Sequence, residues 1–418
     1  MTEFMQAALG VAMLFGAVAI ITTAFAAMKW NPNLGLIAAG VAFGPGGLKI
    51  VAPTDTIVYV MSEVGIMFLL LLIGVELSAD RLKSMAKYVF GLGPAHFIFS
   101  GVLAGVLAKV LGVSLYGSIA IGIAFAMSST AFVLQMLKDS GQLKGQNGQM
   151  SLSVLLFQDL MVPLVLLVIP MLVMLAGVKN AGEGHGHGGG DIKLIPATIT
   201  MTVIFVVSKL VVHNLISMIH AEHRNKFFLP AIIASTMAMG VTSMYFGFSP
   251  SLGAFLAGLS MAGAAWNHDV KSVMKPLEST FLGIFFISVG AQVPVLLPAL
   301  DMAKIVGVAM LLIALKIGAG YIAAQTIKIS KRNSLRLGLT LAQAGEFSFI
   351  VITAATPLLP NANFWTGVAV LSLVCTPMLV SMAGNLRNPK EDTVLDISDE
   401  ITDGAIHMTV QDEKTIAG

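Results

Sequence analysis

Apolar stretches of about 20 residues, the length that a helix needs to cross a bilayer, recur along the whole chain. Charged residues or Gly/Pro breaks separate them. The pattern predicts an all-α polytopic membrane protein with thirteen transmembrane helices. We expect them at residues 4–28, 33–48, 56–77, 85–111, 115–137, 150–178, 194–219, 227–246, 249–265, 273–293, 303–327, 334–359 and 364–384.

Composition supports this class. Hydrophobic residues make up 56% of the chain and charged residues only 11%, which is too little charge to cover the surface of a soluble protein. The net charge of +2 gives no indication of a nucleic-acid partner. The single cysteine, Cys375, excludes a disulfide framework and a thiolate metal site. The partner that we expect is therefore the lipid bilayer.

The basic residues predict an orientation. With the amino terminus outside, sixteen Lys and Arg residues fall on one side of the membrane and five on the other. The positive-inside rule then places the carboxyl terminus in the cytoplasm and the protein in the inner (cytoplasmic) cell membrane. We expect residues 1–384 to form the transmembrane domain and residues 385–418 to be a short, acidic, disordered tail. The His/Gly-rich loop 182–190 could hold a metal or sense pH, although its glycines favour a flexible external linker.

The stretch from Met150 to Met174 carries Gln158 and Asp159 side by side. A charged side chain at the bilayer centre costs about 2.5 to 3.5 kcal/mol, so such residues tend to face a protein interior or a wet cavity on an ion path. Asp159 is therefore the leading candidate for a cation and proton site. The alternative is a carboxylate that pairs with a buried cation for structural reasons.

Other ionisable residues within the predicted spans include Lys316, Glu346, Glu63 and Glu278, and also Lys209, which lies nearer a helix end and can extend to the interface. Lys316 has no basic neighbour nearby, so it needs a carboxylate partner or must lose its proton, and Asp159 is the obvious candidate for that partner. Glu346 lies beside a break formed by small residues. Glu63 and Glu278 are expected to be buried, with structural partners.

A cation site also needs neutral oxygens. Ser128, Ser129 and Thr130 lie in the middle of an apolar span. If the helix is broken there, their hydroxyls can bond to the backbone groups that lose their partners, and the freed carbonyls can coordinate an ion. The alternative is that these hydroxyls bond to their own helix or to a neighbouring one. Gln343 and Gly345 occupy the corresponding place in the twelfth helix if helices one to six and eight to thirteen form inverted repeats.

Five motifs together resemble the monovalent cation:proton antiporter superfamily, antiporter-2 type, over residues 7–384. They are GVELS at 74–78, SST at 128–130, FQD at 157–159, FFISVG at 285–290 and QAGEFSF at 343–349. The pairing of glutamine with aspartate resembles the pairing found in the membrane domain of the glutathione-gated potassium efflux systems.

The resemblance implies a homodimer of thirteen-helix protomers with a sodium/proton antiporter-like fold. Each protomer would have a scaffold part and a core, at about 85–178 and 303–384, that contains two crossed broken helices. Asp159 would bind a cation or a proton, and Lys316 would be the basic partner. Gln158 would belong to the same cation and proton site, at the neutral position that electrogenic sodium antiporters fill with an acid. Ser128 to Thr130 and Gln343 to Glu346 would be the helix breaks.

The expected function is secondary active exchange of a monovalent cation for H⁺ by alternating access, without a cofactor and without enzymatic chemistry. One carboxylate that binds either ion couples the two fluxes. The resemblance favours K⁺ over Na⁺, and a single acid predicts electroneutral exchange. The efflux systems continue into a cytosolic nucleotide-binding domain where this sequence stops, so control by a separate cytosolic regulatory subunit is open.

Three alternatives remain. The chain could be a potassium channel that a separate subunit gates. It could be an ion-coupled carrier of a small organic anion, which would need more basic or amide groups in its cavity than Lys316. An intramembrane enzyme is the weakest alternative, because a hydrolase needs a nucleophile or a metal group and the spans offer no clear motif for either.

Overall fold

The computed structural model describes residues 3–28, 32–45, 47–49, 56–76, 85–143, 145–178, 206, 224–245, 248–262, 267–293 and 299–386. Regular structure within these ranges is helical throughout, which confirms the all-α prediction. Twelve of the thirteen expected spans coincide with helices or broken helix pairs of the described chain. The expected helix at 194–219, apart from Val206, the loop 182–190 and the tail after Leu386 lie outside the described residues.

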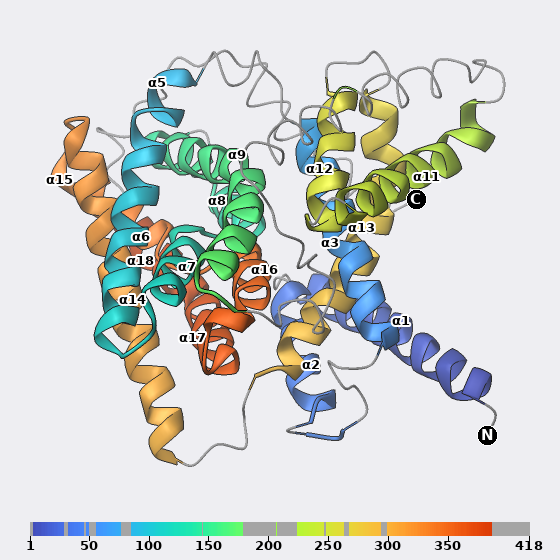
Figure 1. Cartoon of the computed structure of the whole chain (residues 1–418). Helices are drawn as coiled ribbons and strands as arrows, with labels where there is room; N and C mark the ends of the chain where they lie inside the picture. Colours follow the sequence, from blue (N-terminus) through green and yellow to red (C-terminus); the bar gives the residue numbers. More distant parts are fainter. Residues whose placement is uncertain are drawn as a thin grey trace.

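Six of the described helices form one group, which we call the scaffold. They are α1 (Glu3–Ala27), α2 (Pro32–Phe43), α3 (Thr56–Glu76), α11 (Arg224–Tyr245), α12 (Pro250–Met261) and α13 (Asn267–Ala291). Helix α3 packs along α12 and α13, and α13 also packs on α2 (Figure 1). The approach is close: a Cβ on Gly258 of α12 would collide with the backbone of Leu71 on α3. Small residues at such crossings are typical of membrane helices, because van der Waals packing holds the helices together there.

The remaining helices form a second group, which we call the core. They are α5 (Ala86–Val89), α6 (Leu92–Val110), α7 (Leu115–Ala126), α8 (Thr130–Asp139), α9 (Gln146–Leu175), α14 (Ala299–Thr326), α15 (Lys331–Thr340), α16 (Glu346–Ala354), the 3-10 turn η2 (Thr356–Leu358), α17 (Ala362–Val374) and α18 (Thr376–Asn385). Helix α6 packs against α7, α9 and α14, and α16 packs against α7 and α9. The core and the scaffold lie beside each other, with α9 and α12 in contact between them (Figure 1).

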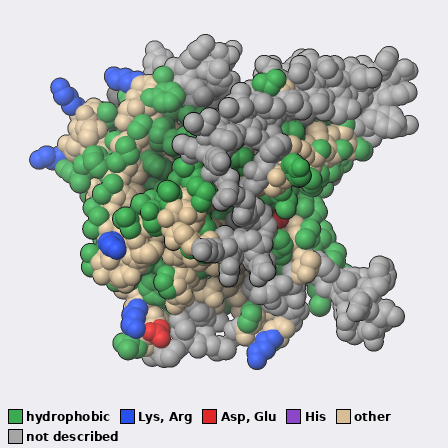
Figure 2. Space-filling view, viewed as in Figure 1, with side chains coloured by type: hydrophobic (Ala, Val, Ile, Leu, Met, Phe, Trp, Pro, Cys, Tyr) green, Lys and Arg blue, Asp and Glu red, His purple; other side chains and the backbone are tan. Residues whose placement is uncertain are grey.

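Seven described helical segments are long and apolar enough to cross a membrane, and four shorter apolar helices accompany them. On the face in Figure 2, hydrophobic side chains cover much of the described surface, and Lys and Arg side chains lie mostly near its margins. Apolar surface of this extent suits lipid rather than water. The protein is therefore a multi-pass membrane protein, as its sequence predicts.

Two spans of the core are broken in the middle. The first break lies at residues 127–129 between α7 and α8, and the second at residues 341–345 between α15 and α16. Ser129 starts α8 as its N-cap, since its hydroxyl accepts a hydrogen bond from the Phe132 N–H at 3.3 Å. Ser348 plays a comparable part at α16, where its hydroxyl accepts from the Gly345 N–H at 3.0 Å. The two breaks predicted from the sequence are confirmed.

The two breaks touch backbone to backbone, and Gly345 makes this contact possible. A Cβ on Gly345 would lie 2.6 Å from the carbonyl carbon of Ser128 and 2.9 Å from the nitrogen of Ser129. Gly345→Ala must therefore push the breaks apart, and we expect it to lower the free energy of unfolding by about 1 to 3 kcal/mol. Denaturation of the purified protein in detergent measures this.

The matched control is Gly318→Ala on α14, where nothing lies within 4 Å of the added Cβ. Alanine is better than glycine in a helix by up to about 1 kcal/mol, so this variant should be as stable as the parent or more stable. If Gly345→Ala behaved like Gly318→Ala, the close contact between the breaks would be wrong.

Candidate functional site

Asp159 lies beside the first break. It is half-buried on α9, and its Oδ1 accepts a hydrogen bond from the Thr130 hydroxyl at 3.3 Å. Thr130 is the first residue of α8, so the carboxylate lies at the amino-terminal end of that helix. Helix N-termini favour negative charge because their N–H groups and macrodipole point outward. The break thus places the acid where a hydroxyl and a helix dipole can support it.

Gln158 stabilises the first break, because its buried side chain forms hydrogen bonds with the backbone there. Its Oε1 accepts a hydrogen bond from the Ser128 N–H at 2.9 Å, and its Nε2 donates to the Ala126 carbonyl at 3.0 Å. One side chain therefore satisfies a donor and an acceptor that the interrupted helix leaves without partners. The sequence predicted that Gln158 belongs to the cation and proton site, whereas in the structure both of its polar atoms bind the backbone of the break.

We call these two hydrogen bonds from the Gln158 side chain to the break the clamp. The clamp predicts that Gln158→Glu destabilises the protein. A carboxylate could still accept from the Ser128 N–H, but its second oxygen would face the Ala126 carbonyl and could not donate to it. Leaving a buried acceptor unsatisfied costs about 1 to 3 kcal/mol, and we expect a loss of that size in unfolding experiments at neutral pH.

The loss should shrink at acidic pH, because a protonated carboxyl group can donate to the Ala126 carbonyl again. The stability difference between Gln158→Glu and the parent, measured at several pH values, checks this. Gln292→Glu, a half-buried amide at the end of α13, is the control for the same chemical change elsewhere. A difference that did not depend on pH would contradict the clamp.

Lys316 joins the two breaks. It is 1% exposed on α14, and its Nζ donates to the Gln343 carbonyl at 2.6 Å, the Met127 carbonyl at 3.0 Å and the Ser128 hydroxyl at 3.2 Å. These bonds use all three protons of the ammonium. The sequence suggested the Asp159 carboxylate as the partner of Lys316. The structure instead directs the ammonium to three neutral oxygens, which the broken helices supply.

Of the three adjacent hydroxyls, only that of Thr130 is bonded to Asp159. The Ser128 hydroxyl is buried and donates to the Leu341 carbonyl at 2.8 Å, across to the second break. The Ser129 hydroxyl is also buried and caps α8. Ser128 therefore joins the two breaks, Ser129 caps α8, and Thr130 is the member of the set that can contribute an oxygen beside the acid.

The second break presents Gln343 and Glu346. Gln343 is fully buried, and its side-chain Oε1 and Nε2 have no hydrogen-bond partner in the described protein. The Ala344 N–H donates to the Ser372 hydroxyl at 3.0 Å. Glu346 is buried at the start of α16, again at a helix N-terminus. The place where the breaks cross is thus a cluster of polar groups inside an apolar core, and we call this cluster the polar island.

Glu63 and Glu278 belong to the scaffold and not to the broken helices. Glu278 is half-buried on α13, and its Oε2 accepts a hydrogen bond from the neighbouring Ser279 hydroxyl at 3.4 Å, so it is less buried than the sequence analysis expected. Glu63 is half-buried on α3 and lines a cavity against the core. Neither lies in the polar island around the breaks.

Two buried residues at the core were missed from the sequence. His96 on α6 is fully buried, with its Nδ1 3.3 Å from Nε2 of Gln158. Arg336 on α15 is fully buried, and its guanidinium donates to the Ala383 carbonyl, to Asn333 and to Gln142. His96 could have been found as the titratable residue in the middle of an apolar span, since Lys87 and Lys109 lie near the ends of that span. Arg336 was counted as a basic residue of the cytoplasmic side.

The chemistry that this arrangement supports is binding and release of a small ion. One half-buried carboxylate with a hydroxyl beside it can hold a proton or a monovalent cation, and one of them excludes the other. Among the described residues, no cluster of three or more His, Cys, Asp or Glu could hold a resident metal ion.

Comparisons with known proteins agree on the kind of molecule. Residues 10–383 match the model of the family described as "Sodium/hydrogen exchanger, transmembrane". Over 359 residues, 84% of this chain, the sequence is 35% identical to K(+) efflux antiporter 1, chloroplastic, and 34% identical to K(+) efflux antiporter 2, chloroplastic, both from Arabidopsis thaliana. The chain spans 30% of the length of each of these relatives.

Solved structures share the fold. The sodium proton antiporter MjNhaP1 from Methanocaldococcus jannaschii at pH 8 matches with a TM-score of 0.67 at 15% identity, over 92% of this chain and 98% of that one. A structure of the same antiporter from an electron microscopy map matches with a TM-score of 0.63 at 16% identity, over 93% of this chain and 100% of that one. The predicted antiporter-like fold class is confirmed.

Proposed function

The chain belongs to the sodium/hydrogen exchanger family, and from this membership we propose that it exchanges a monovalent cation for protons across a membrane. The names of two relatives, K(+) efflux antiporters, favour potassium as the cation. Membership in a family of exchangers also agrees with the expectation that the chain is not an enzyme.

The observation that carries the proposal is the position of Asp159. It is half-buried, it lies at the first helix break, and the Thr130 hydroxyl and the amino-terminal end of α8 are beside it. The carboxylate binds a partly dehydrated cation on one side of the membrane. On the other side a proton replaces the cation, because the two cannot occupy the same oxygens. This competition couples the two fluxes without a covalent step.

Alternating access would come from movement of the core relative to the scaffold. The two breaks move together in this scheme, because Lys316 and Ser128 tie one break to the other. A core that moves as one body carries Asp159 from one side to the other, as in transporters whose binding sites lie at broken helices near the midplane.

One carboxylate at the site supports one-for-one, electroneutral exchange. Gln158 contributes no second negative charge, and both of its polar atoms are bound to the break. Lys316 is bound to neutral oxygens of the breaks, so it stands outside the exchange step. Replacement of an acid by an amide also lowers the field strength of the site, which disfavours the smaller and more strongly hydrated Na⁺ relative to K⁺.

The proposal extends to the assembly of the protein and to its location in the membrane. We propose a homodimer formed through the scaffold and a transmembrane domain that ends near residue 384. The distribution of basic residues supports an external amino terminus and a cytoplasmic carboxyl terminus in the inner cell membrane. A separate cytosolic subunit could then bind the cytoplasmic face.

The test uses proteoliposomes that hold a pH gradient and report it with an internal dye. We expect external K⁺ and Rb⁺ to dissipate the gradient faster than Na⁺ or Li⁺. A clamped membrane potential should leave the rate unchanged if exchange is electroneutral. Flux that ignores the pH gradient and exceeds carrier rates would instead indicate a channel, and no response to any alkali cation would overturn the proposal.

A further inference from the structure

A cavity of about 40 Å³ lies between the scaffold and the core. The scaffold contributes Glu63 of α3, together with Ser249 and Ser251 at the start of α12. The core contributes residues of α9 and α16, among them Thr353. One water needs roughly 10 to 15 Å³ of such volume, so the cavity has room for a small ion with a water beside it.

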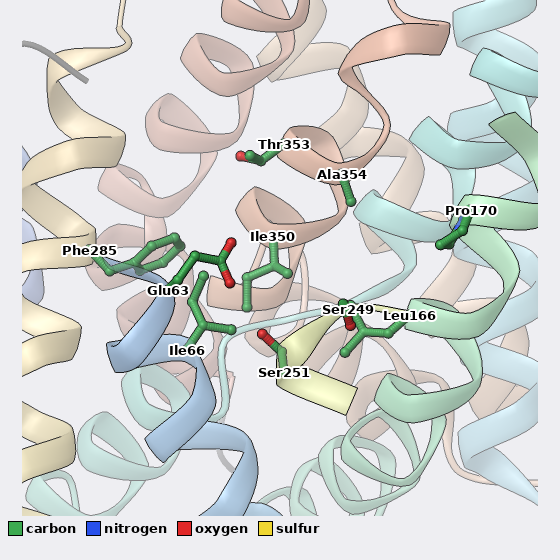
Figure 3. A pocket seen from close by; sticks show the side chains of 10 residues that line it. All are labelled: Glu63, Ile66, Leu166, Pro170, Ser249, Ser251, Phe285, Ile350, Thr353 and Ala354. Atoms are coloured by element: carbon green, nitrogen blue, oxygen red, sulfur yellow. The ribbon is translucent and has the colours of Figure 1, made fainter. Parts of the chain in front are cut away.

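Glu63 is the ionisable group among the residues that line this cavity. Its carboxylate extends from α3 toward Ile350 of α16, and the Ser251 hydroxyl points into the same space (Figure 3). The Oε2 atom of Glu63 is buried and has no hydrogen-bond partner in the described protein. An unpaired carboxylate oxygen away from bulk water is costly, so the site is suited to a ligand that carries positive charge.

The other oxygens limit the class of ligand. Three hydroxyls, of Ser249, Ser251 and Thr353, line the cavity with the one carboxylate (Figure 3). Carboxylate and hydroxyl oxygens are hard ligands, which favour alkali and alkaline-earth cations over transition metals. A single negative charge in a small, mostly apolar cavity neutralises a monovalent ion and leaves a divalent ion with excess charge. A dehydrated or singly hydrated alkali cation fits best.

The cavity lies along the same face of α9 as Asp159. Leu166 and Pro170, which line the cavity, follow Asp159 by seven and eleven residues, and these spacings return to the same side of an α-helix. At 1.5 Å per residue they lie about 10 and 16 Å beyond Asp159, toward the end of α9. An ion that leaves Asp159 along this face would pass the cavity.

We propose that Glu63, Ser251 and Thr353 form a second monovalent-cation site at the boundary between scaffold and core, on the route from Asp159 to the side of the membrane at which α9 ends. The inference rests on the proposed function, because it assumes that Asp159 binds the transported ion. The second site holds a cation before it reaches Asp159 or after it leaves. It therefore affects exchange from one side of the membrane only.

Two measurements on the purified full chain test the site. Equilibrium binding of radioactive Rb⁺ in detergent should give one more ion per protomer for the parent than for Glu63→Gln. In proteoliposomes Glu63→Gln should keep its maximal exchange rate. Its apparent KM for Rb⁺ should rise by about tenfold on the side at which α9 ends and stay unchanged on the other side. Glu278→Gln, the same change elsewhere in the scaffold, should match the parent in both assays.

The outcomes separate the two proposals. Equal Rb⁺ binding and equal KM values on both sides for Glu63→Gln and the parent would overturn the second site, while loss of exchange in Asp159→Asn would still support the first. If the parent protein showed no exchange, the proposed function would be overturned. The number of Rb⁺ ions bound per protomer would still test the Glu63 site. If Glu63→Gln does not fold, Ser251→Ala removes one oxygen and should raise the same one-sided KM, and an unchanged value would overturn the site.

Discussion

Asp159→Asn should reduce cation-driven proton movement to the rate of protein-free vesicles and leave the fold intact. The amide oxygen can still accept the hydrogen bond that the Thr130 hydroxyl now donates at 3.3 Å, so the local geometry keeps its support. The amide has neither the negative charge that binds a cation nor the ability to take up a proton at physiological pH. Dissipation of a pH gradient by K⁺, Rb⁺, Na⁺ and Li⁺ in proteoliposomes measures the loss.

Asp301→Asn is the matched control. Asp301 forms an exposed ion pair with Lys304 at 2.7 Å near the start of α14, so the same change there should leave exchange as it is. Thermal denaturation of both variants separates a lost site from a lost fold. Full exchange by a folded Asp159→Asn protein would remove Asp159 from the transport site and with it the proposed coupling.

The sequence predicted the membrane helices and both breaks well, and the reason is physical. Membrane spans need about 20 apolar residues, so hydrophobic length alone locates them. The breaks were visible because Ser128 to Thr130 and Gln343 to Gly345 interrupt spans that are otherwise apolar. Polar side chains that can satisfy freed backbone groups are what a broken helix requires.

The partners of the buried polar residues were harder to predict. The sequence suggested that Lys316 needs an opposite charge, but helix breaks also supply carbonyl oxygens, and the Met127 and Gln343 carbonyls take that place. Gln158 presents the same difficulty: its neighbour Asp159 faces Thr130, while Gln158 faces the backbone of the break. Side chains one residue apart on a helix point in different directions, and only tertiary packing decides which of them meets the break.

His96 and Arg336 show a further limit. A basic side chain in a sequence counts as a topological marker or as a solvated group unless its surroundings are known. Arg336 is fully buried because the Ala383 carbonyl, Gln142 and Asn333 converge on it from three separate segments of the chain. No local pattern encodes such a convergence, since its members lie up to about 200 residues apart.

The role of Lys316 leads to the second large effect. Lys316→Met keeps a long, unbranched side chain, one atom shorter than that of lysine, but removes all three donors. The Met127 and Gln343 carbonyls and the Ser128 hydroxyl would then lose a buried partner, at about 1 to 3 kcal/mol each. The methionine recovers part of this, because a buried ammonium is itself costly to desolvate. We expect a net loss of about 2 to 4 kcal/mol in the free energy of unfolding, and exchange should fall with it because Lys316 no longer joins the two breaks.

The exposed Lys304→Met on the same helix is the control, and it should change stability by less than about 0.5 kcal/mol. A double-mutant cycle with Asp159→Asn then distinguishes two roles of Lys316: a link between the two breaks, or a counter-charge to Asp159. If Lys316 mainly neutralised Asp159, removal of both charges would restore stability, because neither charge would remain without its partner. If it holds the breaks, the two losses add, because the carbonyls that Lys316 satisfies stay unpaired whether or not the carboxylate is present. Additive stability changes are the expected result, and recovery in the double variant would return Lys316 to the role that its sequence context first suggested.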